Sequence, residues 1–251
     1  MIKIKELCAG YYRRNILDRA ELTVEDGILT VLLGPNGSGK STLLKTAAGI
    51  ITPFSGRIMI DGTDYTDLTP RQLACHVSYM AQSRNTPNII AGRMVLHGRF
   101  PYLSYPRRYS RADTEAAYAA MEAADALDIA DCPMTELSGG QRQKVYLAMT
   151  LAQDTKNVLM DEPMSFLDIQ HQLSLMETAK NLALSGKAVL MVMHDIRMAM
   201  QSADRIVVMT SGRVLCQGTP EQVFDSGLID IAFGVKLRRM ETESGYRYYF
   251  A

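Results

Sequence analysis

The chain lacks tryptophan, any net charge and any long apolar run. Its 27 Lys and Arg residues balance its 27 Asp and Glu residues, whereas a general nucleic-acid-binding protein usually carries a basic excess. We therefore expect no nucleic-acid partner. No apolar stretch approaches the ~18–20 residues that a membrane-spanning helix needs, and Met1 to Lys5 alternate as in a strand rather than as in a signal peptide. Any membrane role is therefore expected to be peripheral, through a partner.

Cysteine is also scarce, and its pattern excludes two kinds of small-protein scaffold. The four cysteines are far apart and form no C-x-x-C pair: Cys8, Cys75, Cys132 and Cys216. This spacing argues against a disulfide framework and against a zinc site. A reducing, cytosolic setting fits best.

The composition that remains is that of an ordinary globular protein, and 251 residues suffice for one α/β domain with or without a small inserted lobe. Short apolar runs alternate with helical stretches, which predicts a largely parallel sheet. A helix is expected over residues 40–48. The predicted strands are 2–7, 27–33, 56–60, 77–81, 157–161, 188–193 and 205–209.

The middle of the chain has a different character. Ala, Met, Glu and Asp dominate residues 112–130, and β-branched residues become scarce, which is helical composition. We therefore predict an inserted helical subdomain over 87–152, between the two parts, 1–86 and 153–251, of a nucleotide-binding core. The tail, 236–251, is expected to end in a strand that packs at a sheet edge.

One segment matches the phosphate-binding pattern G-x-x-x-x-G-K-[ST] without exception, after a predicted strand and before a predicted helix. Glycines let the backbone N–H groups converge on one point, and the helix N-terminus favours negative charge there. Lys40 can then reach the β- and γ-phosphates, and the Ser41 hydroxyl can bind Mg²⁺. The alternative is a chance glycine-rich turn, which the complete match disfavours. The residues of the segment are Gly34, Pro35, Asn36, Gly37, Ser38, Gly39, Lys40, Ser41 and Thr42.

A second functional signal, a pair of acidic residues, lies at the end of another predicted strand. Asp161 and Glu162 follow the apolar run 158–160, and a strand of a parallel sheet delivers its C-terminal residues to the ligand crevice. Asp161 is placed to bind Mg²⁺, and Glu162 to deprotonate an attacking water. An acidic pair alone is a weak signal, because any strand can end this way. Beside a phosphate-binding loop it predicts nucleotide hydrolysis.

Residues 137–141, Leu-Ser-Gly-Gly-Gln, resemble the signature motif of the ABC (ATP-binding cassette) ATPases. Further family motifs follow in the expected order along nearly the whole chain. Each has an ordinary alternative, since a Ser-Gly-Gly turn is often only a helix cap and a single His is often structural. Met164 departs from the Thr or Ser of many members, and we expect only a local packing change from it. The matching residues are Tyr11 for adenine stacking (with Tyr12 as the adjacent alternative), Gln82 of the glutamine loop, Ser165-Phe166-Leu167-Asp168 of the interface loop, and His194 as the switch histidine.

The resemblance implies a P-loop NTPase fold of the α/β class, with a RecA-like, mostly parallel sheet, an N-terminal antiparallel β part and the inserted helical subdomain. It implies an ATPase that uses ATP and Mg²⁺. Two copies form a head-to-tail homodimer in which each ATP is held by the P-loop of one copy and the signature turn of the other. The roles it implies are Glu162 as general base, His194 and Lys40 on the γ-phosphate, Gln82 as a sensor of Mg²⁺ and water, and Ser138, Gly139, Gly140, Gln141 and Asp168 as nucleotide-binding residues across the interface.

Three short stretches, 97–103, 167–172 and 217–221, resemble the subgroup that serves iron-chelate (siderophore), haem and cobalamin uptake. This implies a peripheral subunit at the cytoplasmic face of the cell membrane. Its partners would be an integral permease dimer and, indirectly, a substrate-binding protein. The alternative is a soluble ABC ATPase of repair, translation or cluster assembly. A GTPase switch is disfavoured by the signature turn and by the absence of Asn-Lys-x-Asp.

Residues 99–111 combine arginines with tyrosines. The segment can be a solvated face or a docking surface for a cytoplasmic permease helix near lipid headgroups. A nucleic-acid surface is the third possibility, and the neutral net charge disfavours it.

Overall fold

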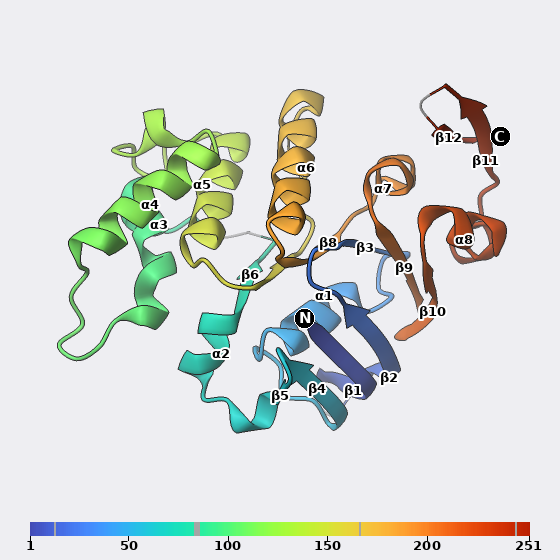
Figure 1. The fold of residues 1–251 in the computed structure, drawn as a ribbon, viewed down its shortest axis with the longest axis horizontal. Coiled ribbons are helices and arrows are strands. Elements are labelled where there is room, and N and C mark those ends of the chain that lie inside the picture. The colour runs from blue at the N-terminus through green and yellow to red at the C-terminus, as the bar shows by residue number, and fades with distance from the viewer. Residues whose placement is uncertain (13, 83–85, 166, 244) are drawn as a thin grey trace.

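A computed structural model describes the chain except residues 13, 83–85, 166 and 244 (Figure 1). Its centre is a six-stranded sheet of order β10-β9-β3-β8-β7-β6. All neighbouring pairs are parallel except β10 with β9, so the predicted mostly parallel sheet is confirmed. The strands are β3 (Leu29–Leu33), β6 (Val77–Met80), β7 (Asn157–Met160), β8 (Ala188–Val192), β9 (Arg205–Thr210) and β10 (Arg213–Gly218).

The middle strands are buried on both faces. Every residue of β3, β7 and β8 is buried, as their largely apolar sequences predict for strands with layers on both sides. β3 pairs with β8 in the register Val31 to Met191, and β7 pairs with β6 in the register Met160 to Met80. The carboxyl ends of these strands therefore lie at one edge of the sheet.

One face of this sheet is covered by an antiparallel sheet and two helices. The antiparallel sheet has the order β2-β1-β4-β5 and shares an apolar cluster with the first helix. This confirms the N-terminal antiparallel β part. The elements are β1 (Ile2–Tyr11), β2 (Arg14–Val24), β4 (Ser55–Ile60), β5 (Thr63–Asp64), the 3₁₀ turn η1 (Tyr65–Asp67), α1 (Lys40–Ala47) and α2 (Pro70–His76).

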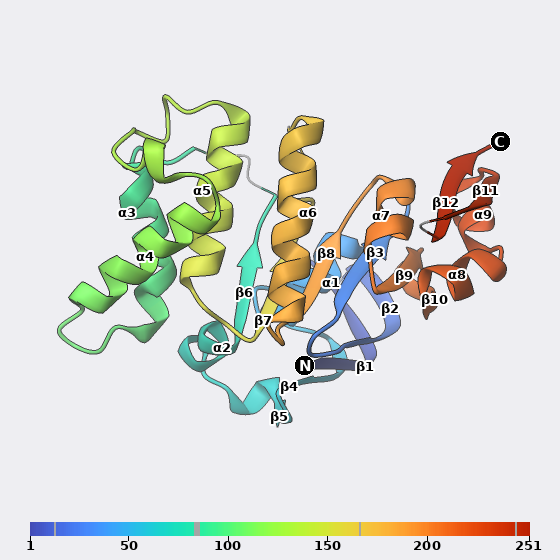
Figure 2. The same cartoon turned by 45° about the horizontal axis from the view of Figure 1, so that its top comes forward.

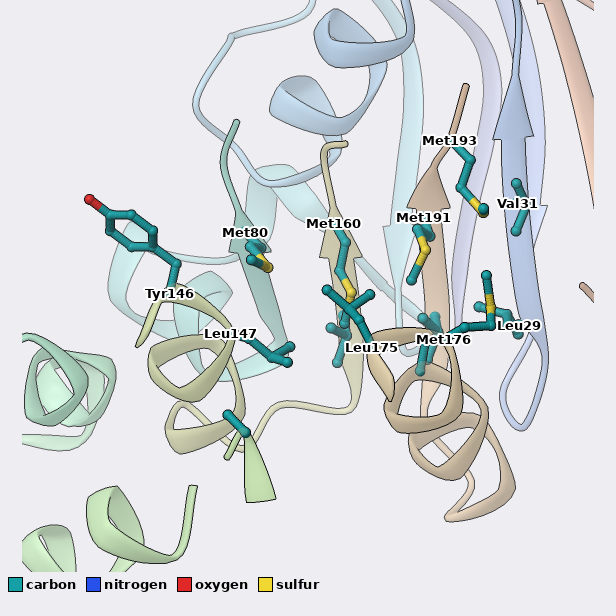
Figure 3. Packing of buried hydrophobic residues seen from close by; sticks show 14 of the residues in the cluster. Leu29, Val31, Met80, Tyr146, Leu147, Met160, Leu175, Met176, Met191 and Met193 are labelled. Atoms are coloured by element: carbon teal, nitrogen blue, oxygen red, sulfur yellow. The ribbon is translucent and has the colours of Figure 1, made fainter. Parts of the chain in front are cut away.

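The opposite face carries most of the remaining helices. In Figure 3 methionines of adjacent strands lie in one row, with Leu147 and Leu175 of two helices directed towards them. Unbranched methionine side chains fill the irregular space between sheet and helices. These helices are α5 (Gly139–Ala152), α6 (Ile169–Leu184), α7 (Ile196–Ser202), α8 (Pro220–Asp225) and α9 (Leu228–Phe233).

The chain between β6 and β7 is helical and lies to one side of the molecule (Figures 1 and 2). Its described residues form no strand beyond an isolated bridge between Ile90 and Pro133. The exact limits of a separate subdomain, 87–152, stay a prediction. The elements before α5 are α3 (Ala91–Leu96), η2 (His97–Tyr102), α4 (Arg111–Ala123) and η3 (Leu127–Ile129).

The tail ends in a strand, as expected, but this strand lies in a hairpin of its own. Among the described strands, β11 (Leu237–Thr242) pairs only with β12 (Gly245–Phe250), so the tail does not extend the edge of the six-stranded sheet. Tyr248 is buried against Phe224 of α8, with ring centroids 5.6 Å apart. Across the described ranges, we find no helix with the length and apolar character that crossing a bilayer requires.

Candidate functional site

The glycine-rich turn lies between β3 and α1, at the carboxyl edge of the sheet (Figure 2). Gly37 and Gly39 have φ angles of 78° and 101°, which residues with a Cβ rarely adopt. At Gly34 a Cβ would come within 2.3 Å of the Met209 carbonyl oxygen and 2.6 Å of Ser38 Oγ. The turn therefore requires glycine for its conformation and for its close packing.

Two groups of this turn point to an anionic ligand. Lys40 is 5% exposed, and its Nζ donates to the carbonyl oxygens of Gly34 (2.7 Å) and Pro35 (3.1 Å), so it is folded over the turn. The Ser38 hydroxyl is buried without a partner among the described residues. Gly39 begins α1 without a side-chain cap, so the first N–H groups of the helix have no protein acceptor there. These donors suit a phosphate group.

Ser41 and Asp161 meet across the gap between α1 and β7. Ser41 Oγ donates to Asp161 Oδ1 at 3.0 Å, and the Tyr79 hydroxyl donates to Asp161 Oδ2 at 3.0 Å. Asp161 itself is 2% exposed. One helix and one strand thus supply the two donors that a buried carboxylate needs.

Glu162 lies between two polar side chains from other strand ends. Its Oε2 accepts from Gln82 Nε2 and its Oε1 faces His194 Nε2, each at 2.7 Å. Its φ angle of 52° is unusual for a residue with a side chain, and such strain gathers at functional sites. Met164 lines a cavity together with Glu162 and His194. The strand ends of β6, β7 and β8 therefore bring Gln82, Glu162 and His194 together.

Burial and charge shift the pKa of the ionisable groups in opposite directions. Burial lowers the pKa of Lys40, and the carboxylates of Glu162 and Asp161 counteract this effect. Burial raises the pKa of Asp161, and the hydrogen bonds from Ser41 and Tyr79 counteract it. Burial, aided by Asp161, raises the pKa of Tyr79, so its phenol remains a donor. The chain thus gathers both charge signs at one poorly solvated position.

The donor set fits a magnesium nucleotide. Mg²⁺ prefers oxygen ligands and is usually held by one or two side chains together with substrate phosphates. Asp161 and Ser41 offer such oxygens beside the turn. In the described residues, no group of three or more His, Cys, Asp or Glu side chains could hold a metal without a further ligand.

The second group of predicted residues lies elsewhere in the chain. Ser138 begins α5, where it and Gln141 satisfy one another's backbone N–H groups as a capping box, and a Cβ on Gly140 would lie 3.7 Å from Leu167. Asp168 begins α6 and accepts from the backbone and ring nitrogens of His171. No described hydrogen bond joins these residues to the turn at Gly34–Lys40. Hydrogen bonds therefore do not join the two groups of predicted residues within the described part of one chain.

The remaining predicted residues differ in position and exposure. Tyr11 ends β1 and is 42% exposed. Tyr12 is fully exposed. Phe166 falls outside the described residues. Asn36 and Thr42 lie in the turn and in α1, and their contacts with a nucleotide stay predictions.

Sequence reasoning missed Tyr79. A signal was available, because Tyr79 lies on β6 three residues before Gln82, and β6 runs parallel to the strand that ends at Asp161. A polar group near the end of a neighbouring strand is a candidate for the same crevice. To find Tyr79 from the sequence, β6 and β7 must be recognised as neighbouring strands.

The basic and aromatic segment 99–111 is partly neutralised by its own fold. Arg99 contacts Asp113 at 3.2 Å and lies 4.1 Å from the Tyr102 ring centre. Arg111 pairs with Glu115, and Arg107 lies over the Phe100 ring. These contacts reduce the basic character that the sequence suggests, and a partner for this segment stays a prediction.

Comparisons with known proteins identify the family of this chain. The family model described as "ABC transporter" matches residues 17–165. The chain is 35% identical over 239 residues to the achromobactin transport ATP-binding protein of Dickeya dadantii, which covers 94% of this chain and 89% of that protein. It is 34% identical over 234 residues to the ferric enterobactin transport ATP-binding protein of Escherichia coli (92% and 86%). It is 38% identical over 222 residues to a hemin import ATP-binding protein of Rhodococcus jostii (88% and 75%).

Solved structures agree as well. A dimeric bacterial ABC transporter cassette superposes with a TM-score of 0.78 at 27% identity, over 88% of this chain and 99% of that one. A putative metal-chelate type ABC transporter in an inward-facing conformation gives a TM-score of 0.84 over 100% and 96%, and its 22% identity bears on the fold alone. The predicted family and fold are confirmed. The chain belongs to the ABC transporter family, as one of its ATP-binding cassettes.

Proposed function

We propose that this chain is the ATP-hydrolysing subunit of an importer that carries an iron-siderophore complex or haem, with cobalamin as a related cargo. The observation that carries the ATPase part is the assembly of Lys40, Asp161 and Glu162 at one sheet edge. The cargo class is supported by relatives whose names specify achromobactin, ferric enterobactin and hemin.

Two copies of the chain complete the nucleotide sites. The P-loop supplies the phosphate donors, while Ser138, Gly139 and Gly140 open α5, whose first N–H groups have no intrahelical acceptor. A head-to-tail pair would place this turn of one copy against the triphosphate held by the other, and two-fold symmetry would form two sites. Asp168 caps α6, and the preceding Leu167 lies beside Gly140, so Asp168 would reach the same interface.

The chemistry follows from the positions of the side chains. Lys40, the turn and the α1 N-terminus bind the phosphates, and Ser41 and Asp161 would hold Mg²⁺. When bound, Mg²⁺ neutralises charge on the β- and γ-phosphates. Glu162 takes a proton from the attacking water as general base. His194 lies 2.7 Å from Glu162 and orients that water and the γ-phosphate. Gln82 donates a hydrogen bond to Glu162 and senses Mg²⁺ and the water through this contact.

Passage of the cargo through the membrane would be carried out by partner proteins. We propose an integral permease dimer that binds two copies of this chain at the cytoplasmic face of the membrane. A substrate-binding protein would act on the permease from the other side. The described chain contributes no membrane-crossing helix, so the energy of ATP binding would pass to the permease through surface contacts.

Lys40→Ala tests the proposal most directly. We expect the variant to fold with an unchanged circular dichroism spectrum and to lose ATP turnover by about 10²–10³-fold, because the main phosphate-binding charge is gone. Affinity purification from native membranes should recover an integral permease with both the wild-type and the variant protein. Uptake of the labelled iron chelate should fail only with the variant.

Two outcomes would contradict parts of this proposal. Normal turnover of Lys40→Ala would remove the ATPase assignment. A chain that hydrolyses ATP but copurifies with no membrane protein would favour the soluble ABC ATPase of repair, translation or cluster assembly instead.

A further inference from the structure

Tyr79 lies at the nucleotide edge of the sheet without a role in the chemistry described so far. It is on β6, opposite Leu159 of β7, and its ring packs against the apolar cluster that contains Leu43 of α1. This is the face of the sheet from which α1 also presents Ser41. The Tyr79 hydroxyl therefore approaches Asp161 from the same layer as Ser41 but from a different element.

The two oxygens of Asp161 have different donors. Ser41 donates to Oδ1 and Tyr79 donates to Oδ2, both at 3.0 Å. The Asp161 backbone N–H donates to the Met80 carbonyl oxygen at 2.9 Å, which fixes the main chain. A carboxylate with a fixed backbone still rotates about its side-chain bonds. Donors on both oxygens restrict that rotation and set the plane of the carboxylate.

The same segment of chain also orients the next carboxylate. Gln82, three residues after Tyr79, donates to Glu162 Oε2 at 2.7 Å. Tyr79 and Gln82 thus reach Asp161 and Glu162, two consecutive residues at the end of β7. The end of β6 therefore orients both acidic side chains through hydrogen bonds.

We propose that Tyr79 is a positioning residue for metal and nucleotide binding, because its phenol holds Asp161 Oδ2 and keeps the carboxylate directed beside the Ser41 hydroxyl. This inference rests on the proposed function, which assigns Asp161 and Ser41 to Mg²⁺. It is narrower than that function, since ATP binding through Lys40 does not require the phenol. Loss of the hydroxyl alone should weaken metal-dependent binding and spare metal-free binding.

Tyr79→Phe removes the hydroxyl and retains the ring. Mn²⁺ serves as the probe, and its affinity is measured by electron paramagnetic resonance with a non-hydrolysable ATP analogue. We expect the Kd for Mn²⁺ to rise about tenfold, as for loss of one hydrogen bond to a charged group. Binding of a fluorescent nucleotide in EDTA should change less than about twofold. That titration also counts the folded sites, so a loss of folded protein is detected separately.

Two controls isolate the proposed contact. Tyr65→Phe removes the hydroxyl of another partly buried tyrosine that packs against the same cluster, and it should leave both affinities unchanged. In an Asp161→Asn background, Tyr79→Phe should cause no further loss of Mn²⁺ affinity, because the two groups act through one contact.

The outcomes separate this inference from the proposed function. An unchanged Mn²⁺ affinity in Tyr79→Phe, or an equal loss of metal-dependent and metal-free binding, overturns the role of Tyr79. A second loss in the Asp161→Asn background overturns it too. A wild-type chain that binds neither nucleotide nor Mn²⁺, or a Lys40→Ala variant that binds nucleotide normally, overturns the proposed function instead.

Discussion

Two turns of this chain each begin a helix, and they differ in how far the chain completes their surroundings. The turn at 34–39 leads into α1 without a side-chain cap and is surrounded by Lys40 and by the Ser41–Asp161 pair. The turn at Ser138 is capped by Gln141 and makes no described hydrogen bond to the first turn. The chain itself places ionisable groups around the first turn, whereas the second turn would, in the proposed dimer, direct its helix N–H groups at a nucleotide held by the other copy.

We expect the two halves of the site to respond differently to mutation. Under the proposed pairing of two copies, side chains near the first turn act on phosphate binding and on chemistry. Side chains near the second turn act only when two copies meet.

Glu162→Gln should show the largest effect of the substitutions compared here. The amide keeps the shape of the side chain and can still contact Gln82 and His194, but it cannot accept a proton from water. We expect ATP turnover to fall by about 10²–10⁴-fold while ATP still binds. Because ATP is not consumed, the protein should elute as a stable dimer in ATP on size-exclusion chromatography. Near-normal turnover would remove Glu162 as the base.

Ser138→Ala and Ser110→Ala form a matched pair. Each serine caps a helix as part of a capping box, Ser138 on α5 and Ser110 on α4, so each substitution should cost about 1 kcal/mol of folding free energy. Only Ser138→Ala should also weaken ATP-induced dimerisation, because only this turn would face a nucleotide. Chemical denaturation and sedimentation in ATP measure the two effects.

An equal loss of dimerisation in both variants would mean that stability alone is responsible. An unaffected dimer in Ser138→Ala would deny the serine a role at the interface.

Local patterns predicted much of the fold. The runs at 29–33 and 188–192 are apolar except for Thr30, because both faces are buried, so they are recognisable as central strands. β2, at 14–24, was not predicted, because its outward side chains are charged and its pairing with β1 contains register shifts. The sequence predicts a strand at the end of the chain but places it at a sheet edge. In the structure this strand lies in a separate hairpin, where Tyr248 packs against Phe224.

The site shows the same limit. The P-loop and the acidic pair follow from contiguous residues whose backbone dictates their geometry. The contact of Gln82 and His194 with the same glutamate depends on which strands are neighbours. Tyr79 was missed for that reason, because its partner is 82 residues away along the chain. Sequence separation hides such contacts until the strand order is known.

A mixing experiment tests the central claim, that each nucleotide site takes one turn from each copy. Lys40→Ala disables the first turn and Gly139→Arg the second, and each variant alone should be inactive. In a mixed dimer, one site would combine the intact turns of both chains. ATP turnover of the mixture, measured after co-refolding or coexpression, should rise to roughly one quarter of the wild-type value if the sites act independently. Turnover no higher than that of either variant alone would contradict the account.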